Sequence, residues 1–237
     1  LVIDDLGDRE LICDVLLDQN LGASAEKYDG KLPIDCRLLL GPSFALLRSE
    51  FKDWRKRSLE GRLHRNVENI LITMGGTDAK NYTLKVLKEI IKSECAKNCK
   101  FTIVLGGSYT HTTTLYNFLN EYKLQFSVLS NIKNMAEIMS KSDLCIGAGG
   151  STSWERCCLG LPTISFAIAE NQVGVLAELE KKTCTIISSL AKIRADFEKL
   201  LREKHSRKLR MLSLNSSRVT DGNGIKLILE KLDQPFD

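Results

Sequence analysis

The chain has 237 residues, with 34 Lys and Arg against 30 Asp and Glu and a formal net charge of +4. The 43% apolar content excludes a disordered chain, and 16 Gly with only 4 Pro exclude a collagen-like one. No apolar run approaches the roughly 20 residues that a membrane span needs, and the scattered basic residues give no reason to expect nucleic-acid binding.

The eight cysteines lack the spacing of a disulfide framework or a structural zinc site. Cys157 and Cys158 are adjacent, and no pair has the C-x-x-C spacing that zinc sites commonly use. We therefore expect reduced, mostly buried thiols in a cytoplasmic protein, with no metal and no cofactor.

The chain opens with the apolar run Leu1–Ile3, followed by Asp4 and Asp5. This pattern predicts a buried parallel strand that leads into a loop. Chains seldom begin inside a core strand, and the sequence starts with neither Met nor a signal-peptide pattern. We therefore expect further residues upstream.

Short apolar runs alternate with segments of helical period along most of the chain. The predicted strands are 13–17, 37–40, 70–74, 101–105, 126–129, 144–147 and 163–166. The predicted helices are 79–92, 112–122, 135–140, 153–159, 193–202 and 225–232. Such alternation predicts an α/β fold with parallel sheets and right-handed crossovers.

A charged segment with little apolar periodicity, KDWRKRSLEGRLHRN, interrupts this pattern at residues 52–66. We interpret it as a solvated basic linker; a nucleic-acid patch is the minor alternative. The predicted divisions are an incomplete N-terminal unit at 1–52, a linker at 53–66, a nearly complete unit at 67–220, and a C-terminal helix at 221–237 that is a candidate to return to the first unit.

A glycine-rich turn directly follows the strand 70–74. Gly75 and Gly76 let the backbone approach a ligand, and the start of the next helix offers free N–H groups to an anion. Without a ligand, the same residues would form a tight turn capped by Thr77 or Asp78.

The richest turn follows the strand 144–147. It supplies two glycines, three hydroxyls and a carboxylate: Gly149, Gly150, Ser151, Thr152, Ser153 and Glu155. Capping a helix needs only one hydroxyl, so the other two are candidates to bind an anion. Glu155 could accept hydrogen bonds from a ribose diol, or simply compensate the helix dipole.

A third turn, at 105–108, lacks an obvious cap, and we interpret it as a plain loop. No turn matches G-x-x-x-x-G-K-[ST], and no G-x-G-x-x-G follows the first strand. The sequence therefore argues against a Walker-type NTPase and a dinucleotide enzyme.

Three polar residues elsewhere are further candidates. Asn171 and Gln172 follow the strand 163–166 and could bind sugar hydroxyls or acetamido groups; their alternative role is helix capping. Arg48 is a candidate to clamp a diphosphate, although alone it would be an ordinary surface arginine.

Together, the segments GPSFALLRSEF, ILITMGGTDAKN, IGAGGSTSWERCCLGLP and AENQ resemble the bacterial UDP-sugar hydrolases of pseudaminic acid biosynthesis, including spore-coat polysaccharide biosynthesis-like proteins. The resemblance implies a GT-B architecture of two Rossmann-like units with parallel sheets, the N-terminal one incomplete, and UDP bound by residues 67–220. It also implies metal-independent hydrolysis of a UDP-linked 2,4-diacetamido-2,4,6-trideoxy sugar to UDP and free sugar.

The same resemblance implies roles for individual residues. Glu155 would hold the ribose, and the hydroxyls of residues 151–153 would meet the diphosphate, with UDP lying between the turns at Gly75 and Gly149. Asn81 and Asn171 would contact substrate, and Arg48 would favour the charged leaving group. The full predicted binding set is Arg48, Gly75, Gly76, Thr77, Asn81, Gly149, Gly150, Ser151, Thr152, Ser153, Glu155, Asn171 and Gln172.

The family's catalytic histidine belongs to a glycine-rich segment at the extreme N-terminus, which this sequence does not contain. His64, His111 and His205 do not fit that motif, and Leu11 stands where relatives often carry histidine. We therefore expect UDP binding without useful turnover, and Asp5 and Asn171 are the candidates if the chain is active. The alternatives are a GT-B glycosyltransferase with a UDP-sugar donor and a non-catalytic UDP-sugar-binding module.

Overall fold

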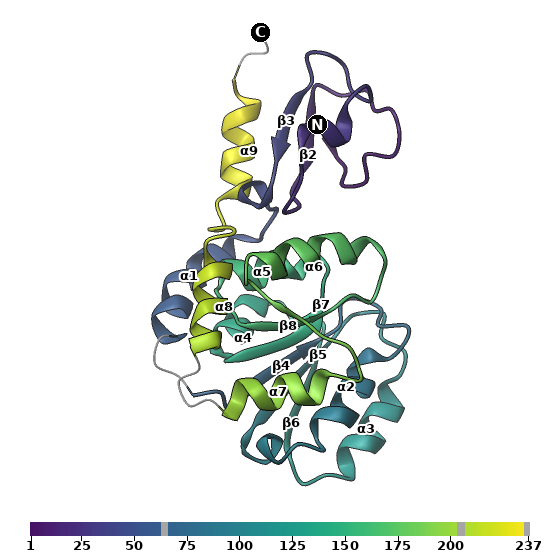
Figure 1. Cartoon of the computed structure of the whole chain (residues 1–237), viewed down its shortest axis with the longest axis vertical. Helices are drawn as coiled ribbons and strands as arrows, with labels where there is room; N and C mark the ends of the chain where they lie inside the picture. The colour runs from purple at the N-terminus through teal and green to yellow at the C-terminus, as the bar shows by residue number, and fades with distance from the viewer. Residues whose placement is uncertain (63–65, 203–206, 235–237) are drawn as a thin grey trace.

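The computed structural model describes residues 1–62, 66–202 and 207–234, which build two parallel sheets of unequal size (Figure 1). The smaller sheet has the order β1-β2-β3. Its strands are β1 (Val2–Ile3), β2 (Val15–Asp18) and β3 (Arg37–Leu40). β2 is fully buried, as a central parallel strand should be.

The first strand differs from the prediction of a buried strand. β1 pairs with β2 alone, and the side chain of Ile3 is 57% exposed. Because no other described strand pairs with its outer edge, β1 is an edge strand, with Ile3 exposed and Val2 half-buried.

The larger sheet has the order β6-β5-β4-β7-β8-β9, and every pairing in it is parallel. Its strands are β4 (Asn69–Thr73), β5 (Lys100–Leu105), β6 (Gln125–Ser130), β7 (Leu144–Ala148), β8 (Thr163–Phe166) and β9 (Ile186–Ile187). The predicted α/β fold with parallel sheets is confirmed.

Helices cover both faces of the larger sheet because successive strand residues point to opposite sides. Ile70 and Ile72 pack with α2 (Tyr82–Ile90), α3 (Thr112–Asn120) and α7 (Ile193–Arg202). Leu71 packs with α1 (Ser49–Arg62), α4 (Met135–Lys141), α5 (Thr152–Cys158) and α6 (Asn171–Lys181).

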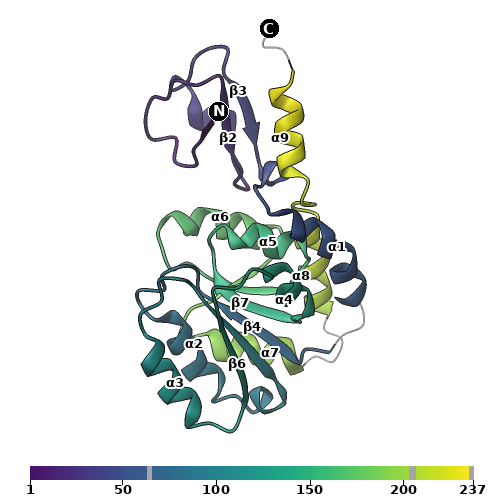
Figure 2. The same ribbon diagram turned by 180° about the vertical axis from the view of Figure 1, so that it is seen from behind.

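The remaining helices are α8 (Arg207–Ser217), α9 (Gly224–Leu232) and the 3₁₀ helices η1 (Ala25–Tyr28), η2 (Pro42–Phe44) and η3 (Glu94–Asn98). α9 lies beside the small sheet, where Ile228 and Leu232 pack with Val15, Leu17 and Leu39 (Figure 2). None of the described helices combines the length and apolar character that a membrane crossing requires.

Residues expected to form a solvated linker belong instead to α1, which packs against α4, α5 and α8. Phe51 and Trp54 pack in the core, but polar side chains make several of the other contacts, which is why apolar periodicity did not reveal the helix. Arg55 donates a 2.7 Å hydrogen bond to the carbonyl at the end of α8, and Ser58 Oγ donates one of 2.8 Å to the Leu159 carbonyl. Residues 63–65 of the predicted linker lie outside the described residues.

Candidate functional site

A cavity of about 460 Å³ opens at the carboxyl ends of β4, β7 and β8. This is the edge at which open α/β sheets bind their ligands. Seven of the predicted site residues line it: Gly75, Gly76, Thr77, Gly150, Ser151, Thr152 and Gln172. The structure therefore brings together segments that are nearly 100 residues apart in the sequence.

The turn after β4 shapes one wall of the cavity. Asp78 has a φ of 41°, and its buried carboxylate accepts hydrogen bonds from the Tyr82 and Thr83 amides at 2.7 and 2.9 Å. Asp78 is thus a cap of α2, whereas Thr77 is exposed at the cavity. Asn81 does not line the cavity; its Oδ1 accepts from the Leu84 amide at 3.3 Å.

The turn after β5, predicted as a plain loop, supports the turn after β4. A Cβ at Gly106 would lie 2.1 Å from the Gly76 carbonyl oxygen, so only glycine permits this approach. The Ser108 amide donates to that same oxygen at 3.1 Å. The second turn therefore holds the first in place from behind, without lining the cavity.

The hydroxyls at the start of α5 point in different directions. Ser151 is exposed, makes no side-chain capping bond and lines the cavity, as does Thr152. Ser153 is only 2% exposed, and its Oγ accepts a 2.9 Å hydrogen bond from Arg156. Ser153 therefore faces the protein interior, contrary to the expectation that all three hydroxyls meet a ligand.

Sequence reasoning missed Arg156, which lies beneath the turn after β7 and is 2% exposed. It donates to the Ala148 carbonyl at 2.7 Å, and within the described part of the chain no carboxylate lies at ion-pair distance from it. A Cβ at Gly147 would lie 2.6 Å from Arg156 Nη1, which explains the glycine there. Arg156 follows Ser153 by three residues, about one helical turn. This spacing could have indicated from the sequence that the two side chains meet.

Two other polar side chains frame the cavity. Lys80, which sequence reasoning also missed, is the cationic side chain among the described lining residues. The Gln172 Oε1 accepts from the Ile168 amide at 3.0 Å, and its Nε2 would lie 3.9 Å from a Cβ added at Gly150. Gln172 can therefore offer two N–H donors to a ligand. Asn171 is exposed at the first position of α6 and does not line the cavity.

The charge at the cavity favours an anion. The Asp78 carboxylate is already satisfied by the α2 amides, and Lys80 adds a positive charge. The N-terminal ends of α2 and α6 lie at the same edge and carry partial positive charge. Backbone amides of the glycine turns complete an arrangement suited to phosphate.

Comparison with known proteins agrees with this geometry. Residues 69–223 match the profile of the glycosyltransferase family 28 C-terminal domain. The chain belongs to this family. It is 28% identical, over 72% of its length and 58% of the relative's, to the UDP-2,4-diacetamido-2,4,6-trideoxy-beta-L-altropyranose hydrolase of Campylobacter jejuni. The resemblance drawn from the sequence is therefore confirmed.

Solved structures show the same GT-B fold. MurG of Acinetobacter baumannii superposes with a TM-score of 0.61 at 14% identity, over 92% of this chain and 60% of that one. The UDP-GlcNAc 2-epimerase of Neisseria meningitidis, bound to UDP-GlcNAc, gives a TM-score of 0.60 at 19% identity, over 84% and 56%. The chain covers between 26% and 58% of the length of the curated relatives it matches.

Glu155 and Arg48 lie at the side of the family 28 domain that faces α1. Glu155 is half-buried, and burial raises the pKa of its carboxyl, while the positive charges of Arg48 and Arg156 oppose that rise. Arg48 forms an ion pair of 2.7 Å with Glu50 and donates to the Lys133 carbonyl at 3.3 Å. Neither Glu155 nor Arg48 lines the cavity itself.

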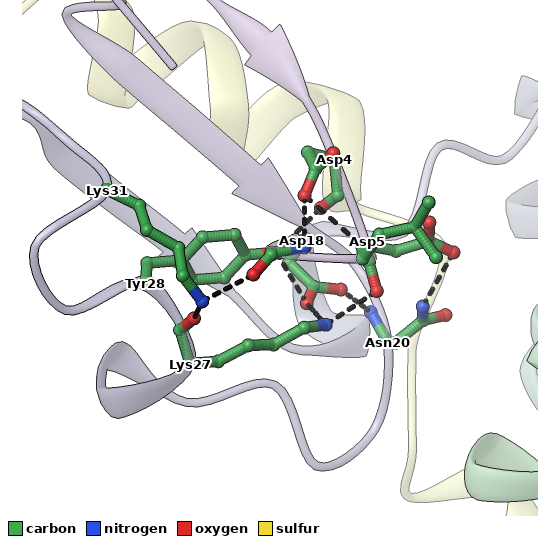
Figure 3. Close-up of polar contacts among 9 residues, drawn as sticks. Asp4, Asp5, Asp18, Asn20, Lys27, Tyr28 and Lys31 are labelled. Carbon is green, nitrogen blue, oxygen red and sulfur yellow. Dashed lines mark hydrogen bonds and ion pairs between the residues drawn. The ribbon is translucent and has the colours of Figure 1, made fainter. Parts of the chain in front are cut away.

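A second polar cluster lies at the carboxyl ends of β1 and β2 in the small sheet (Figure 3). Asp18 is fully buried, and its Oδ2 accepts from Lys27 Nζ at 2.8 Å and lies 3.0 Å from the Tyr28 hydroxyl. Burial and the Asp18 charge raise the pKa of Tyr28. This network is rigid because each buried polar group has a partner.

The catalytic candidate Asp5 lies at the exposed edge of this cluster (Figure 3). Its carboxylate accepts from Asn20 Nδ2 at 3.1 Å, and its carbonyl accepts from Lys27 Nζ at 2.6 Å. The loop after β2 then meets the family 28 domain: Leu21 packs against its core, and a Cβ at Gly22 would lie 3.1 Å from Glu178.

His111, the histidine that the structure describes, adds no group to the cavity. His111 Nε2 lies 3.2 Å from the Ala79 carbonyl and is not a lining residue. His64 and His205 lie outside the described residues. Nowhere in residues 1–62, 66–202 and 207–234 do three or more His, Cys, Asp or Glu side chains gather as a metal site would require.

Proposed function

We propose that this chain binds the UDP part of a nucleotide sugar in the cavity between the turns after β4 and β7. The observation that carries the proposal is the meeting of both glycine turns, Gln172 and Lys80 around one cavity. Two glycine turns bring backbone amides close to a diphosphate, and Lys80 supplies a positive charge. The solved relative that holds UDP-GlcNAc has the same fold.

Within this proposal, different residues bind the diphosphate, the sugar and the ribose. Ser151 and Thr152 donate hydroxyl hydrogen bonds to the diphosphate, and Gln172 donates its amide N–H groups to the sugar. Glu155 accepts the ribose hydroxyls from the side of α1, next to Arg48. Ser153 takes no part, because its side chain is buried and does not line the cavity.

We further propose that the reaction is metal-independent hydrolysis of the anomeric C–O bond of a UDP-linked 2,4-diacetamido-2,4,6-trideoxy sugar. Water forms the new bond to the anomeric carbon, the bond to UDP breaks, and UDP leaves with the electron pair. The proton of the water passes to a base, for which Asp5 is the candidate in the small unit. The support is the hydrolase of Campylobacter jejuni, 28% identical over 72% of this chain.

Transfer of the sugar to an acceptor is the second candidate function. It is favoured by the family match, since the profile is that of a glycosyltransferase domain. The two reactions share the leaving group and differ only in the nucleophile, so the UDP site described above serves either.

Binding is tested by calorimetry with UDP and uridine. Lys80→Ala should weaken UDP binding by about tenfold, roughly 1.4 kcal/mol, and leave uridine binding nearly unchanged. Lys123→Ala is the matched control, because Lys123 is exposed and does not line the cavity. Equal losses for UDP and uridine would contradict a diphosphate at Lys80.

The reaction is tested with the UDP-linked diacetamido sugar and no acceptor. Release of UDP together with free sugar supports hydrolysis. Release that depends on an added acceptor supports transfer. For the 237-residue chain we expect UDP binding without release, because the family's histidine segment is not in this sequence. UDP binding without release in either condition, by a protein extended upstream to include such a segment, would indicate a UDP-sugar-binding module.

A further inference from the structure

Two of the three half-buried cysteines meet at the amino ends of β2 and β3. The sulfur atoms of Cys13 and Cys36 lie 3.6 Å apart. The strand register explains the meeting, because Val15 lies opposite Arg37, and the Arg37 amide donates to the Asp14 carbonyl at 2.8 Å. We propose that Cys13 and Cys36 are a thiol–disulfide site that a small disulfide such as glutathione disulfide oxidises.

The geometry distinguishes this pair from the other six thiols. A disulfide needs a sulfur–sulfur distance of about 2.05 Å, so the two side chains must approach by only about 1.5 Å. Cys99 Sγ instead donates to the Cys95 carbonyl at 3.4 Å. The others, Cys145, Cys157, Cys158 and Cys184, are buried in the larger unit.

Glutathione disulfide is the oxidant, and the reaction needs no other reactant. The thiolate of one cysteine attacks a sulfur of glutathione disulfide and displaces one glutathione thiolate, which takes up the released proton. The second cysteine then attacks the mixed disulfide and displaces the other glutathione. The protein loses two protons and two electrons, and two molecules of reduced glutathione carry them.

Cys36 should be a slow nucleophile at neutral pH. Burial, the neighbouring Cys13 and the Asp14 charge raise the pKa of Cys36 to about 11, so little thiolate is present.

The crosslink would act on the polar cluster at the other end of these strands. It closes residues 14–35 into a covalent ring, and this ring contains Asp18 together with its partners Lys27 and Tyr28 (Figure 3). A disulfide restricts the unfolded chain and so favours the folded small sheet. The oxidised protein should therefore resist unfolding of this sheet more strongly than the reduced protein.

Peptide mapping tests the proposal directly. The whole chain is incubated with glutathione disulfide at pH 8.5, its free thiols are alkylated, and it is digested with trypsin. The expected product is a peptide of residues 10–27 linked to one of residues 32–37, two hydrogens lighter than their sum, which a reductant separates. Cys95→Ser should leave this product unchanged, and Cys36→Ser should abolish it.

Other products would overturn the proposal. One is recovery of the two peptides separately, with their cysteines alkylated or bound to glutathione. The other is a disulfide from Cys13 to a different cysteine or to a second chain. Urea unfolding supplies a second readout. Oxidation should raise the unfolding midpoint of the native sequence, and should leave that of the Cys13→Ser/Cys36→Ser variant unchanged.

Discussion

The Tyr109 hydroxyl donates a 2.8 Å hydrogen bond to Asn81 Oδ1, and so joins the turn after β5 to the turn after β4. Burial and the Asp78 charge raise the pKa of Tyr109 to about 12, so this hydroxyl remains protonated through the neutral range. Asn81 itself has a φ of 52° and caps α2. One hydrogen bond thus supports the strained residue from which α2 and the cavity wall begin.

Tyr109→Phe should therefore lower the free energy of unfolding by about 1 kcal/mol, the usual net value of such a bond. Tyr116→Phe is the control, since Tyr116 is 45% exposed on α3. Urea denaturation of both variants measures the difference. An equal effect of the two substitutions would show that the bond to Asn81 contributes no stability of its own.

Most strands of the larger sheet were predictable because buried parallel strands are continuous apolar runs. The observed Thr163–Phe166 strand matches the prediction, and β7 extends only one residue further. β9 has two residues, too few to show a pattern. α1 was missed because it buries few apolar side chains: Phe51 and Trp54 pack in the core, while Arg55 and Ser58 hold the helix by hydrogen bonds to carbonyl groups, which leave little apolar periodicity.

The sequence predicted the parts of the site that glycine turns form. It did not predict which neighbouring side chains point into the cavity. The glycines of the turns after β4 and β7 mark the cavity because glycine allows a close approach of the backbone to a ligand. Ser153 and Thr152 are adjacent in sequence, yet only Thr152 lines the cavity. The direction of Ser153 depends on Arg156, a buried partner that hydroxyl spacing alone does not reveal.

Glu155→Gln should raise stability at neutral pH while weakening UDP binding. Burial raises the pKa of Glu155 in the folded protein, so the folded state holds this proton at pH values where the unfolded state has lost it. Stability is therefore lost as the pH rises from about 4.5 through the folded pKa. The stability that Glu155→Gln gains over the native sequence should be present at pH 7 and disappear near pH 4. Urea unfolding midpoints of both proteins across that range measure it.

Glu137→Gln is a control for which we expect the opposite change in stability. Hydrogen bonds from Lys141 and Asn134 lower its pKa, so its contribution is present at neutral pH and lost in acid. Glu137→Gln should lower the pH 7 midpoint slightly. If Glu155→Gln behaved in the same way, the assignment of Glu155 as a destabilising carboxylate would fail.

Arg156→Met should destabilise the protein by about 1–3 kcal/mol for each buried acceptor that it leaves unsatisfied. The carbonyl of Ala148 and the hydroxyl of Ser153 both lose their donor. Arg210→Met removes an exposed arginine from α8 and should change stability little. Thermal denaturation of the pair tests this, and similar melting temperatures would contradict a structural role for Arg156.

Gly149 and Gly150 are neighbours, but we expect alanine to have different effects at the two positions. A Cβ at Gly149 would lie 2.6 Å from Leu176, a fully buried side chain of α6. A Cβ at Gly150 would have Gln172 Nε2, at 3.9 Å, as its nearest neighbour, and would project at the cavity. The first substitution overpacks the core, whereas the second adds a methyl group to the ligand site.

Gly149→Ala should consequently cost about 1–3 kcal/mol of stability, as overpacked cores do. Gly150→Ala should unfold at nearly the native urea concentration but bind UDP more weakly, because its methyl group occupies space that the diphosphate needs. Urea titration and calorimetry on both variants separate the two effects. Unchanged UDP affinity in a normally folded Gly150→Ala protein would place the diphosphate elsewhere and count against the proposed site.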